Sequence, residues 1–419
     1  MICFQENMKA FRELNRKRSK KHHPCIWLTC HFPRKSNEFV ATPMDYESPD
    51  LVFDILWFMR VNFRMKSTKT YCEKVIRNFL SFIFVLGLFY TFSIRMRSFI
   101  VEDKGAMIVT EMLAFLCSIV LWISLNMQRH KIIAVNGATI SDQMFPTIYN
   151  NGNSRRQRWI NLISLITISA PIFTSALSMV ISKITGEDIN KHLTFLCFGF
   201  QLNVRTLYKY PILFLLRSFD LYICFASSQM ICLLFSILSY NVHIRVKETE
   251  KQFETNVKDT NVLYSSSKAL KSYKRMQKII LNLEKAISLP LFYVIAFLLC
   301  ELFALMSNII HLVRRSNSSS SLCVVVSATL LTGFHAVMLI FRVSSVEESY
   351  HSLIRTFVNL PDDNLSPPYV KELLQMLKLL AYHDQLYLTA WGMIPVRRGL
   401  FLTVVGTLAT YGVLLVQFT

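Results

Sequence analysis

Seven stretches of the chain are apolar over a length that can cross a lipid bilayer, and polar or charged residues separate them. A transmembrane helix needs about 20 predominantly apolar residues. The stretches cover residues 75–94, 105–127, 159–182, 219–244, 287–313, 322–341 and 400–418. The pattern therefore predicts an all-α, polytopic membrane protein with seven transmembrane helices.

The composition agrees with this prediction. Hydrophobic residues make up 52 % of the 419 residues and charged residues 17 %, against about 25 % charged residues in soluble domains. This balance excludes a disordered chain, a collagen-like repeat and an ordinary soluble enzyme. A net charge of +19 would suggest nucleic acid in a soluble protein. In a membrane protein the positive charge instead indicates which side of the bilayer each loop faces. We therefore expect the lipid bilayer as a partner and no nucleic acid.

The distribution of Lys and Arg predicts the orientation. The first 21 residues are basic but lack the apolar core of a secretory signal, so we expect a cytoplasmic N-terminus. The 2–3, 4–5 and 6–7 loops hold 21 Lys and Arg residues, and the loops on the other side hold 10. Because cytoplasmic loops are enriched in these residues, the C-terminus is predicted to be extracellular. G-protein-coupled receptors have the opposite orientation.

Two predicted cytoplasmic loops contain helical patterns. The 4–5 loop repeats apolar residues at spacings of three and four, as coiled coils do, and is interpreted as the fifth segment extended into the cytosol. The 6–7 loop contains a second apolar face. The stripe residues are Tyr273, Met276, Ile280 and Leu283 in the first loop and Leu373, Leu377 and Leu380 in the second. Two hypotheses stay open: these helices pack on their own subunit, or they form an anchor that joins subunits.

The predicted organisation follows from these patterns. A cytoplasmic N-terminal region precedes helices 1–4, the cytoplasmic helical loop, helices 5–6, a loop with the anchor helix, and a last helix. Their bounds are 1–74, 75–244, 245–286, 287–341, 342–399 and 400–418.

Motifs for enzyme or metal chemistry are absent from the sequence. The ten Cys residues form no CxxC pair. His22, His23, Cys25, Cys30 and His31 cluster near the N-terminus, but their spacing fits no standard zinc finger. We expect no enzyme activity, no metal and no cofactor. Asn317 begins a glycosylation sequon on the predicted outer side, close to the membrane edge, and is a weak candidate for modification.

Charged residues inside membrane segments are the default candidates for function. Glu111 and Glu301 are the clear cases. If the fourth segment begins nearer Tyr210, Arg217 and Asp220 also lie inside the membrane as an i,i+3 pair. The predicted ligand contacts, all in the outer half or near the middle of the bilayer, are Tyr90, Glu111, Asp220, Tyr222, Glu301 and Asn308. The alternative is that these groups are structural and bond to neighbouring helices.

The last predicted helix suits a pore lining. Thr410 and Gln417 are seven residues apart and share a helical face, and Tyr411, Leu414 and Phe418 form an adjacent face. One such helix per subunit around an axis would present a ring of Gln417 and a ring of Phe418, and apolar rings can gate by dewetting. The alternative is that these side chains pack inside the bundle.

The C-terminal region resembles the signature of insect gustatory receptors. The resemblance rests on Thr410 and Tyr411 followed by Gln417 and Phe418, and on Gly392 and the segment 394–398 upstream. The resemblance implies a tetrameric, non-selective cation channel whose seventh helix lines the pore and whose cytosolic helices join subunits. It implies a tastant pocket in the outer half of each subunit and a gate at Phe418 beside Gln417. A homotetramer or a heteromer with related receptors, in the plasma membrane of gustatory neuron dendrites, is expected.

The ligand class is narrowed by one departure from the family. Sugar receptors usually carry an acidic residue after the Tyr of the signature, where this chain has Gly412. We therefore expect a receptor for bitter or plant secondary compounds. The alternatives are a sugar-responsive channel, a metabotropic receptor coupled to G proteins, and a secondary transporter. The chain shows no internal repeat that would favour a transporter, although Pro171 and Pro290 could kink two segments.

Overall fold

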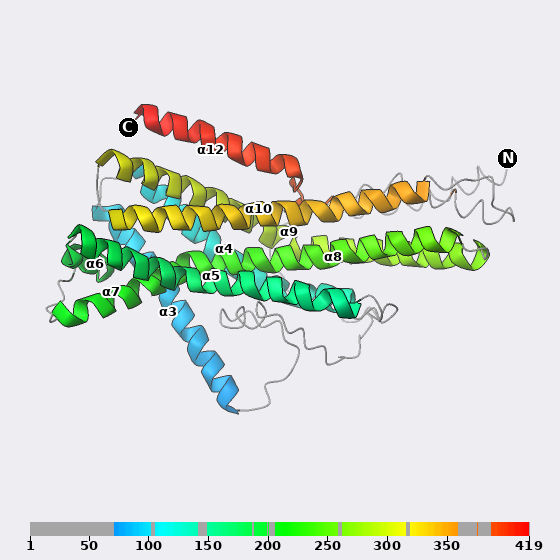
Figure 1. Cartoon of the computed structure of the whole chain (residues 1–419), viewed down its shortest axis with the longest axis horizontal. Helices are drawn as coiled ribbons and strands as arrows, with labels where there is room; N and C mark the ends of the chain where they lie inside the picture. Colours follow the sequence, from blue (N-terminus) through cyan, green and yellow to red (C-terminus); the bar gives the residue numbers. More distant parts are fainter. Residues whose placement is uncertain are drawn as a thin grey trace, which may run out of the picture. The chain divides into compact units, whose positions relative to one another are not determined.

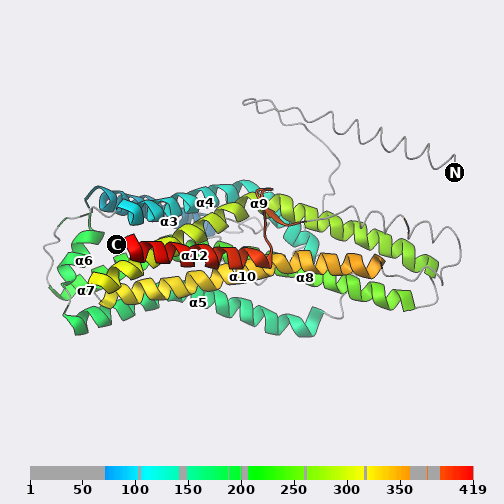
Figure 2. The same ribbon diagram turned by 90° about the horizontal axis from the view of Figure 1, so that it is seen from above.

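The protein, described here from a computed structural model, is built almost entirely of long helices (Figures 1 and 2). Every element described below lies within one compact unit that begins at Asp45. The structure describes residues 71–101, 105–140, 149–186, 188–198, 200, 206–258, 262–315, 319–358, 375 and 387–418.

The described elements comprise long helices, one short helix, a π-helical turn and two short strands. In chain order they are α3 (Tyr71–Val101), α4 (Gly105–Ile140), α5 (Tyr149–Thr185), α6 (Ile189–Leu196), α7 (Thr206–Leu221), the π-helical turn η1 (Tyr222–Ala226), α8 (Ser227–Lys258), α9 (Val262–Arg315), α10 (Ser319–Val358), β1 (Thr389–Ala390), β2 (Ile394–Pro395) and α12 (Arg398–Phe418).

Each of the seven predicted segments lies within this helical framework, and the fourth runs through the end of α7, η1 and α8 without a break. Among the described residues, five helical stretches are long and apolar enough to cross a membrane. They are Val109–Ala138, Arg158–Thr185, Tyr208–Gln252, Ser272–Val313 and Ser321–Thr356. The apolar stretch of α12 is shorter, and α3 is not among the five. The chain is thus a multi-pass, all-α membrane protein.

The helix α9 is far longer than a bilayer is thick. The 54 residues of α9 span about 80 Å at 1.5 Å per residue, against a hydrocarbon core of about 30 Å. The helices α8 and α10 extend alongside it in the same direction (Figure 1). The segment before Ile287 is therefore continuous with the fifth apolar segment, as its spacing predicted.

The core is organised around α8, which is buried on almost all sides. Residues 226–239 of η1 and α8 are all buried, as expected of a helix that is apolar all round. Serines let neighbouring backbones come close. Ser228 meets Ser118 of α4 with 2.9 Å between the hydroxyl oxygens, and Ser236 donates to the Cys232 carbonyl at 2.9 Å.

The apolar stripe of the predicted 4–5 loop packs inside the chain. Tyr273, Met276, Ile280 and Leu283 are all buried within one subunit, and the Tyr273 and Tyr350 hydroxyl oxygens lie 3.0 Å apart. The stripe thus has an intrachain packing role, and its part in joining subunits stays a prediction. The three leucines proposed for the second anchor face lie outside the described residues.

A small hairpin attaches the base of α12 to α9. Its strands β1 and β2 pair antiparallel, and the turn holds Trp391 and Gly392 at positive φ, 54° and 71°. The Trp391 amide donates to the Ser288 carbonyl at 2.9 Å, and the Trp391 ring lies 5.3 Å from that of Phe292. A Gly at the second of these positions avoids the steric cost that a side chain meets in the left-handed region.

Two arginines tie the same base to α10. The Arg397 Nε donates to Glu347 Oε1 at 2.9 Å, and Arg398 pairs with Glu348 at 2.5 Å. The Arg397 guanidinium also lies over the Tyr387 ring at 4.5 Å. The start of α12 is therefore held by both α9 and α10, beside which α12 lies in Figure 2.

The close approach of α3 to the turn between α7 and α8 gives a first prediction. A Cβ atom added at Gly87 would lie 2.7 Å from Phe219 Cζ and 2.8 Å from Ile223 Cδ1. Replacing Gly87 with Leu overfills this contact, and we expect a loss of about 1–3 kcal/mol. The measurement is the melting temperature and monodispersity of purified receptor in detergent. Gly137→Leu, where no atom lies within 4 Å, is the control, and equal behaviour of the two variants would contradict the prediction.

Candidate ligand cavity and pore helix

A polar cavity of about 270 Å³ lies inside the helical bundle, among α3, α4, α6, α7, α9 and α10. Four of the six predicted ligand contacts line it, namely Glu111, Asp220, Glu301 and Asn308. Further polar residues of the lining are Arg95, His192, Arg217 and Ser321. Residues far apart in the sequence thus converge on one internal space.

A partly buried ion pair lines the cavity. The Arg95 guanidinium pairs with the Glu111 carboxylate, and their side chains are 18 % and 22 % exposed. Asn308 Nδ2 donates to the second Glu111 oxygen at 3.0 Å, and Arg95 also donates to Cys224 Sγ at 3.3 Å. These contacts link α3, α4, η1 and α9 through charge-assisted bonds.

Asp220 has neutral partners. Its Oδ1 atom accepts a hydrogen bond from the Thr91 hydroxyl at 3.2 Å and from Cys224 Sγ at 3.7 Å. Arg217 stands one turn earlier on α7 and lines the same cavity. Because α7 begins at Thr206, both residues lie within the helix, as the earlier start of the fourth segment predicted.

Glu301 differs from the other carboxylates. It lines the cavity and is 8 % exposed. Among the residues that the structure describes, it makes no hydrogen bond and no ion pair. Burying such a group without a partner is costly.

The two tyrosines among the predicted contacts lie beside the cavity rather than in its lining. The Tyr90 hydroxyl donates to the Leu196 carbonyl at 2.9 Å, and its ring meets Phe198 edge-on at 5.5 Å. Tyr222 is half-buried and packs against the main hydrophobic core. Both fix the helices around the cavity.

Arg95 directly follows the first predicted segment, residues 75–94, and is not among the predicted ligand contacts. A signal for its partner was present, because α3 and α4 are consecutive helices joined by a short connection. Arg95 lies six residues before the end of α3 and Glu111 six residues after the start of α4. Residues equally distant from such a turn face each other when the helices are antiparallel.

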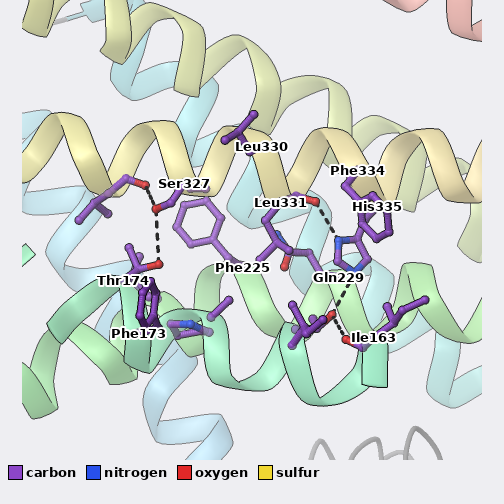
Figure 3. Close-up of a pocket in the computed structure, with 17 residues that line it drawn as sticks. Ile163, Phe173, Thr174, Phe225, Gln229, Ser327, Leu330, Leu331, Phe334 and His335 are labelled. Atoms are coloured by element: carbon purple, nitrogen blue, oxygen red, sulfur yellow. Dashed lines mark hydrogen bonds between the residues drawn. The ribbon is translucent and has the colours of Figure 1, made fainter. Parts of the chain in front are cut away.

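A second, apolar cavity of about 470 Å³ lies between α5, the η1–α8 turn and α10 (Figure 3). Four of its polar residues bond in two pairs, and a fifth, Gln229, donates to Thr332 outside the lining at 3.2 Å. The Thr167 hydroxyl lies 3.1 Å from His335 Nε2, and Ser327 donates to the Thr174 hydroxyl at 3.4 Å. This cavity was not predicted, because its lining is scattered over three helices without a polar signal.

The two cavities share a wall. Four residues line both of them, namely Leu221, Phe225, Val324 and Ala328. In Figure 3, Phe225 lies between α5 and α10 among the lining residues. Apolar side chains alone therefore separate the charged space from the apolar one.

The helix α9 has the polar cavity on one side and α12 on the other. Glu301 and Asn308 line the cavity. Between them, Phe303 meets the Tyr411 ring edge-on at 4.7 Å, and Met306 Sδ lies 3.3 Å from the position of a Cβ at Gly412. The same segment of α9 thus contacts both the cavity and α12.

The candidate pore residues occupy different faces of α12. Thr410, Leu414 and Gln417 are exposed, and the Thr410 hydroxyl donates to the Gly406 carbonyl at 2.9 Å. Tyr411 is half-buried against α9. The side chain of Phe418 and all of Asn317 lie outside the described residues.

Comparison with known proteins identifies the fold. No family model matches the sequence, and no curated protein matches it. The olfactory receptor OR5 of the insect Machilis hrabei, solved with eugenol, superposes with a TM-score of 0.61 at 16 % identity, over 87 % of this chain and 98 % of that one. The chain shares the fold of insect olfactory receptors. A second structure of the same receptor, OR5, superposes with a TM-score of 0.62 at 12 % identity, over 88 % of this chain and 97 % of that one.

The buried ion pair gives a second prediction. Glu111→Gln removes the carboxylate that pairs directly with the Arg95 guanidinium, and we expect a loss of up to about 3–5 kcal/mol. Removing both charges in Arg95→Met with Glu111→Leu restores most of that stability. Melting temperatures of purified receptor in detergent measure both effects. The control is Glu348→Gln, which breaks an exposed pair and costs about 1 kcal/mol or less; a double variant as unstable as Glu111→Gln would contradict the prediction.

Proposed function

We propose that the chain is a subunit of a ligand-gated, non-selective cation channel that serves taste. The observation that carries the proposal is the position of α9, which lines the polar cavity with Glu301 and Asn308 and contacts α12 through Phe303 and Met306. The fold that the chain shares with an insect olfactory receptor supports it, as does the gustatory-receptor signature from Thr410 to Phe418.

In this proposal the ligand binds inside the bundle and changes the position of α12. A ligand shifts such an equilibrium only by its difference in affinity for the closed and open arrangements. The base of α12 is held by Trp391, Arg397 and Arg398, whereas its far end carries exposed side chains. Motion of α9 therefore acts mainly on the end that bears Gln417 and Phe418.

Several subunits are needed for a pore in this proposal. Apolar side chains of α12 remain exposed in the single chain, for example Leu402 at 71 % and Val413 at 57 %. Exposed apolar faces of this kind suit contact with lipid, with further subunits, or with a pore axis. A homotetramer, or a heteromer with related receptors, in the plasma membrane of gustatory neuron dendrites completes the proposal.

The proposed ligands are bitter or plant secondary compounds. The structure of OR5 was solved with eugenol, and in this chain Gly412 replaces the acidic residue of the sugar-receptor signature. A cavity of about 270 Å³ beside one of about 470 Å³ suits a small organic molecule, because such sites are mostly apolar with a few placed polar groups.

The gate is tested without knowledge of the ligand. Phe418→Ala removes the proposed apolar ring, and we expect a standing cation current in whole-cell recordings where wild type shows none. Phe401→Ala, at the other end of α12 and 6.0 Å from the Phe341 ring, is the matched control and is expected to stay closed. A well-expressed Phe418→Ala variant without current would count against a gate at this position.

Orientation separates this proposal from a metabotropic receptor. We expect an epitope tag at the N-terminus to be reached by antibody only after permeabilisation, and a tag at the C-terminus to be labelled on intact cells. Surface labelling of the N-terminal tag instead would favour the G-protein-coupled alternative. The basic 2–3, 4–5 and 6–7 loops are the physical reason for the expectation.

A further inference from the structure

We propose that the polar cavity takes an organic cation, a protonated amine with a compact apolar body, and that Glu301 is its countercharge. The inference rests on the proposed function and names the class of ligand for that site. It is carried by the charges of the lining, by the burial of Glu301 and by the shared wall of the two cavities.

The lining carries more carboxylates than guanidiniums. Glu111, Asp220 and Glu301 face Arg95 and Arg217, with His192 as a further titratable group. With the imidazole neutral, the formal balance of the lining is one negative charge. A ligand with one positive charge neutralises the cavity, whereas an anion adds to the imbalance.

The partners of these groups single out Glu301. Glu111 is occupied by Arg95 and Asn308, and Asp220 accepts from Thr91 and Cys224. Within the described part of the chain, Glu301 has no hydrogen bond or ion pair, although only 8 % of it is exposed. A carboxylate held in this state gains most from a cation that arrives with the ligand, since pairing offsets the cost of its burial.

The shape of the lining indicates the rest of the ligand. Phe225 and Leu221 separate Glu301 from the apolar cavity and line both spaces. Phe195 adds a second aromatic ring to the polar cavity. Aromatic faces attract cations as well as apolar groups, so an ammonium group near Glu301 with an apolar body against Phe225 satisfies both sides.

Matched probes test the class directly on the full-length protein. Phenethylamine, 2-phenylethanol and 3-phenylpropanoate share one apolar body and differ in charge; tryptamine with tryptophol and butylamine with butanol extend the comparison. Ligands that bind the folded state raise its melting temperature in proportion to occupancy. We expect at least one amine to bind wild type about tenfold or more tightly than its alcohol, and the carboxylate to bind most weakly.

The alcohols enter micelles more readily than the charged amines do, which lowers their free concentration and by itself favours apparent binding of the amines. The comparison of wild type with Glu301→Gln in the same detergent therefore decides whether a preference comes from the cavity.

Variants assign the preference to one carboxylate. Glu301→Gln keeps the shape and removes the charge, so the amine and its alcohol should then bind within about twofold of each other. Glu301→Asp retains the charge and should retain the preference, which keeps the test decisive if the Gln variant folds poorly. Glu348→Gln, an exposed carboxylate outside the cavity, is the matched control and should leave the preference unchanged.

Two results overturn the inference. One is a wild-type receptor that binds no amine better than its alcohol, and the other is a preference that survives in Glu301→Gln. Because the readout is binding, either result leaves the channel proposal standing if Phe418→Ala conducts. If wild type prefers an amine but the Phe418→Ala variant never conducts, the result supports the cation-binding site and contradicts the proposed gate at Phe418.

Discussion

The contact of α9 with both the polar cavity and α12 is the constraint on which the rest of the structure depends. In an α-helix, residues two positions apart point in different directions, and residues three or four apart share a face. Glu301 and Asn308 therefore line the cavity while Phe303 packs on Tyr411. One helix carries both contacts, so no intermediate element lies between the polar cavity and α12.

Polar groups inside a membrane-spanning bundle are expensive, and part of those in this bundle are paired. Backbone groups are satisfied within the helices, as a bilayer requires, and some buried serines bond to carbonyls one turn back, as Ser227 does to Ile223 at 2.7 Å, whereas others, such as Ser175 and Ser239, have no hydrogen-bond partner among the described residues. Arg95 and Glu111 neutralise each other. Glu301 is a buried carboxylate without a hydrogen bond or ion pair among the described residues, and ionisable residues inside a membrane segment are candidate functional sites.

The two ends of α12 are held very differently. At its base, backbone and ionic contacts from Trp391, Arg397 and Arg398 join it to α9 and α10. Farther along, the described contacts are packing contacts, such as Tyr411 on Phe303. A helix fixed at one end and packed through apolar side chains at the other can tilt with little loss of hydrogen bonding. This arrangement suits a proposed gate at the weakly held end.

The amino-acid sequence by itself determined the class of fold and half of the polar residues that line the cavity. Long apolar stretches can only be helices in a bilayer, since every backbone group must be bonded internally, and charges such as Glu111 and Glu301 stand out within them. The continuity of α9 followed from the three-and-four spacing of Tyr273, Met276 and Ile280. The tertiary structure alone decided which side chains meet. Helical periodicity specifies a face of a helix but not the neighbour that this face contacts. Three features therefore depend on the packed helices: Tyr222 does not line the polar cavity, an apolar cavity forms beside His335, and α9 contacts the polar cavity and α12 with different faces.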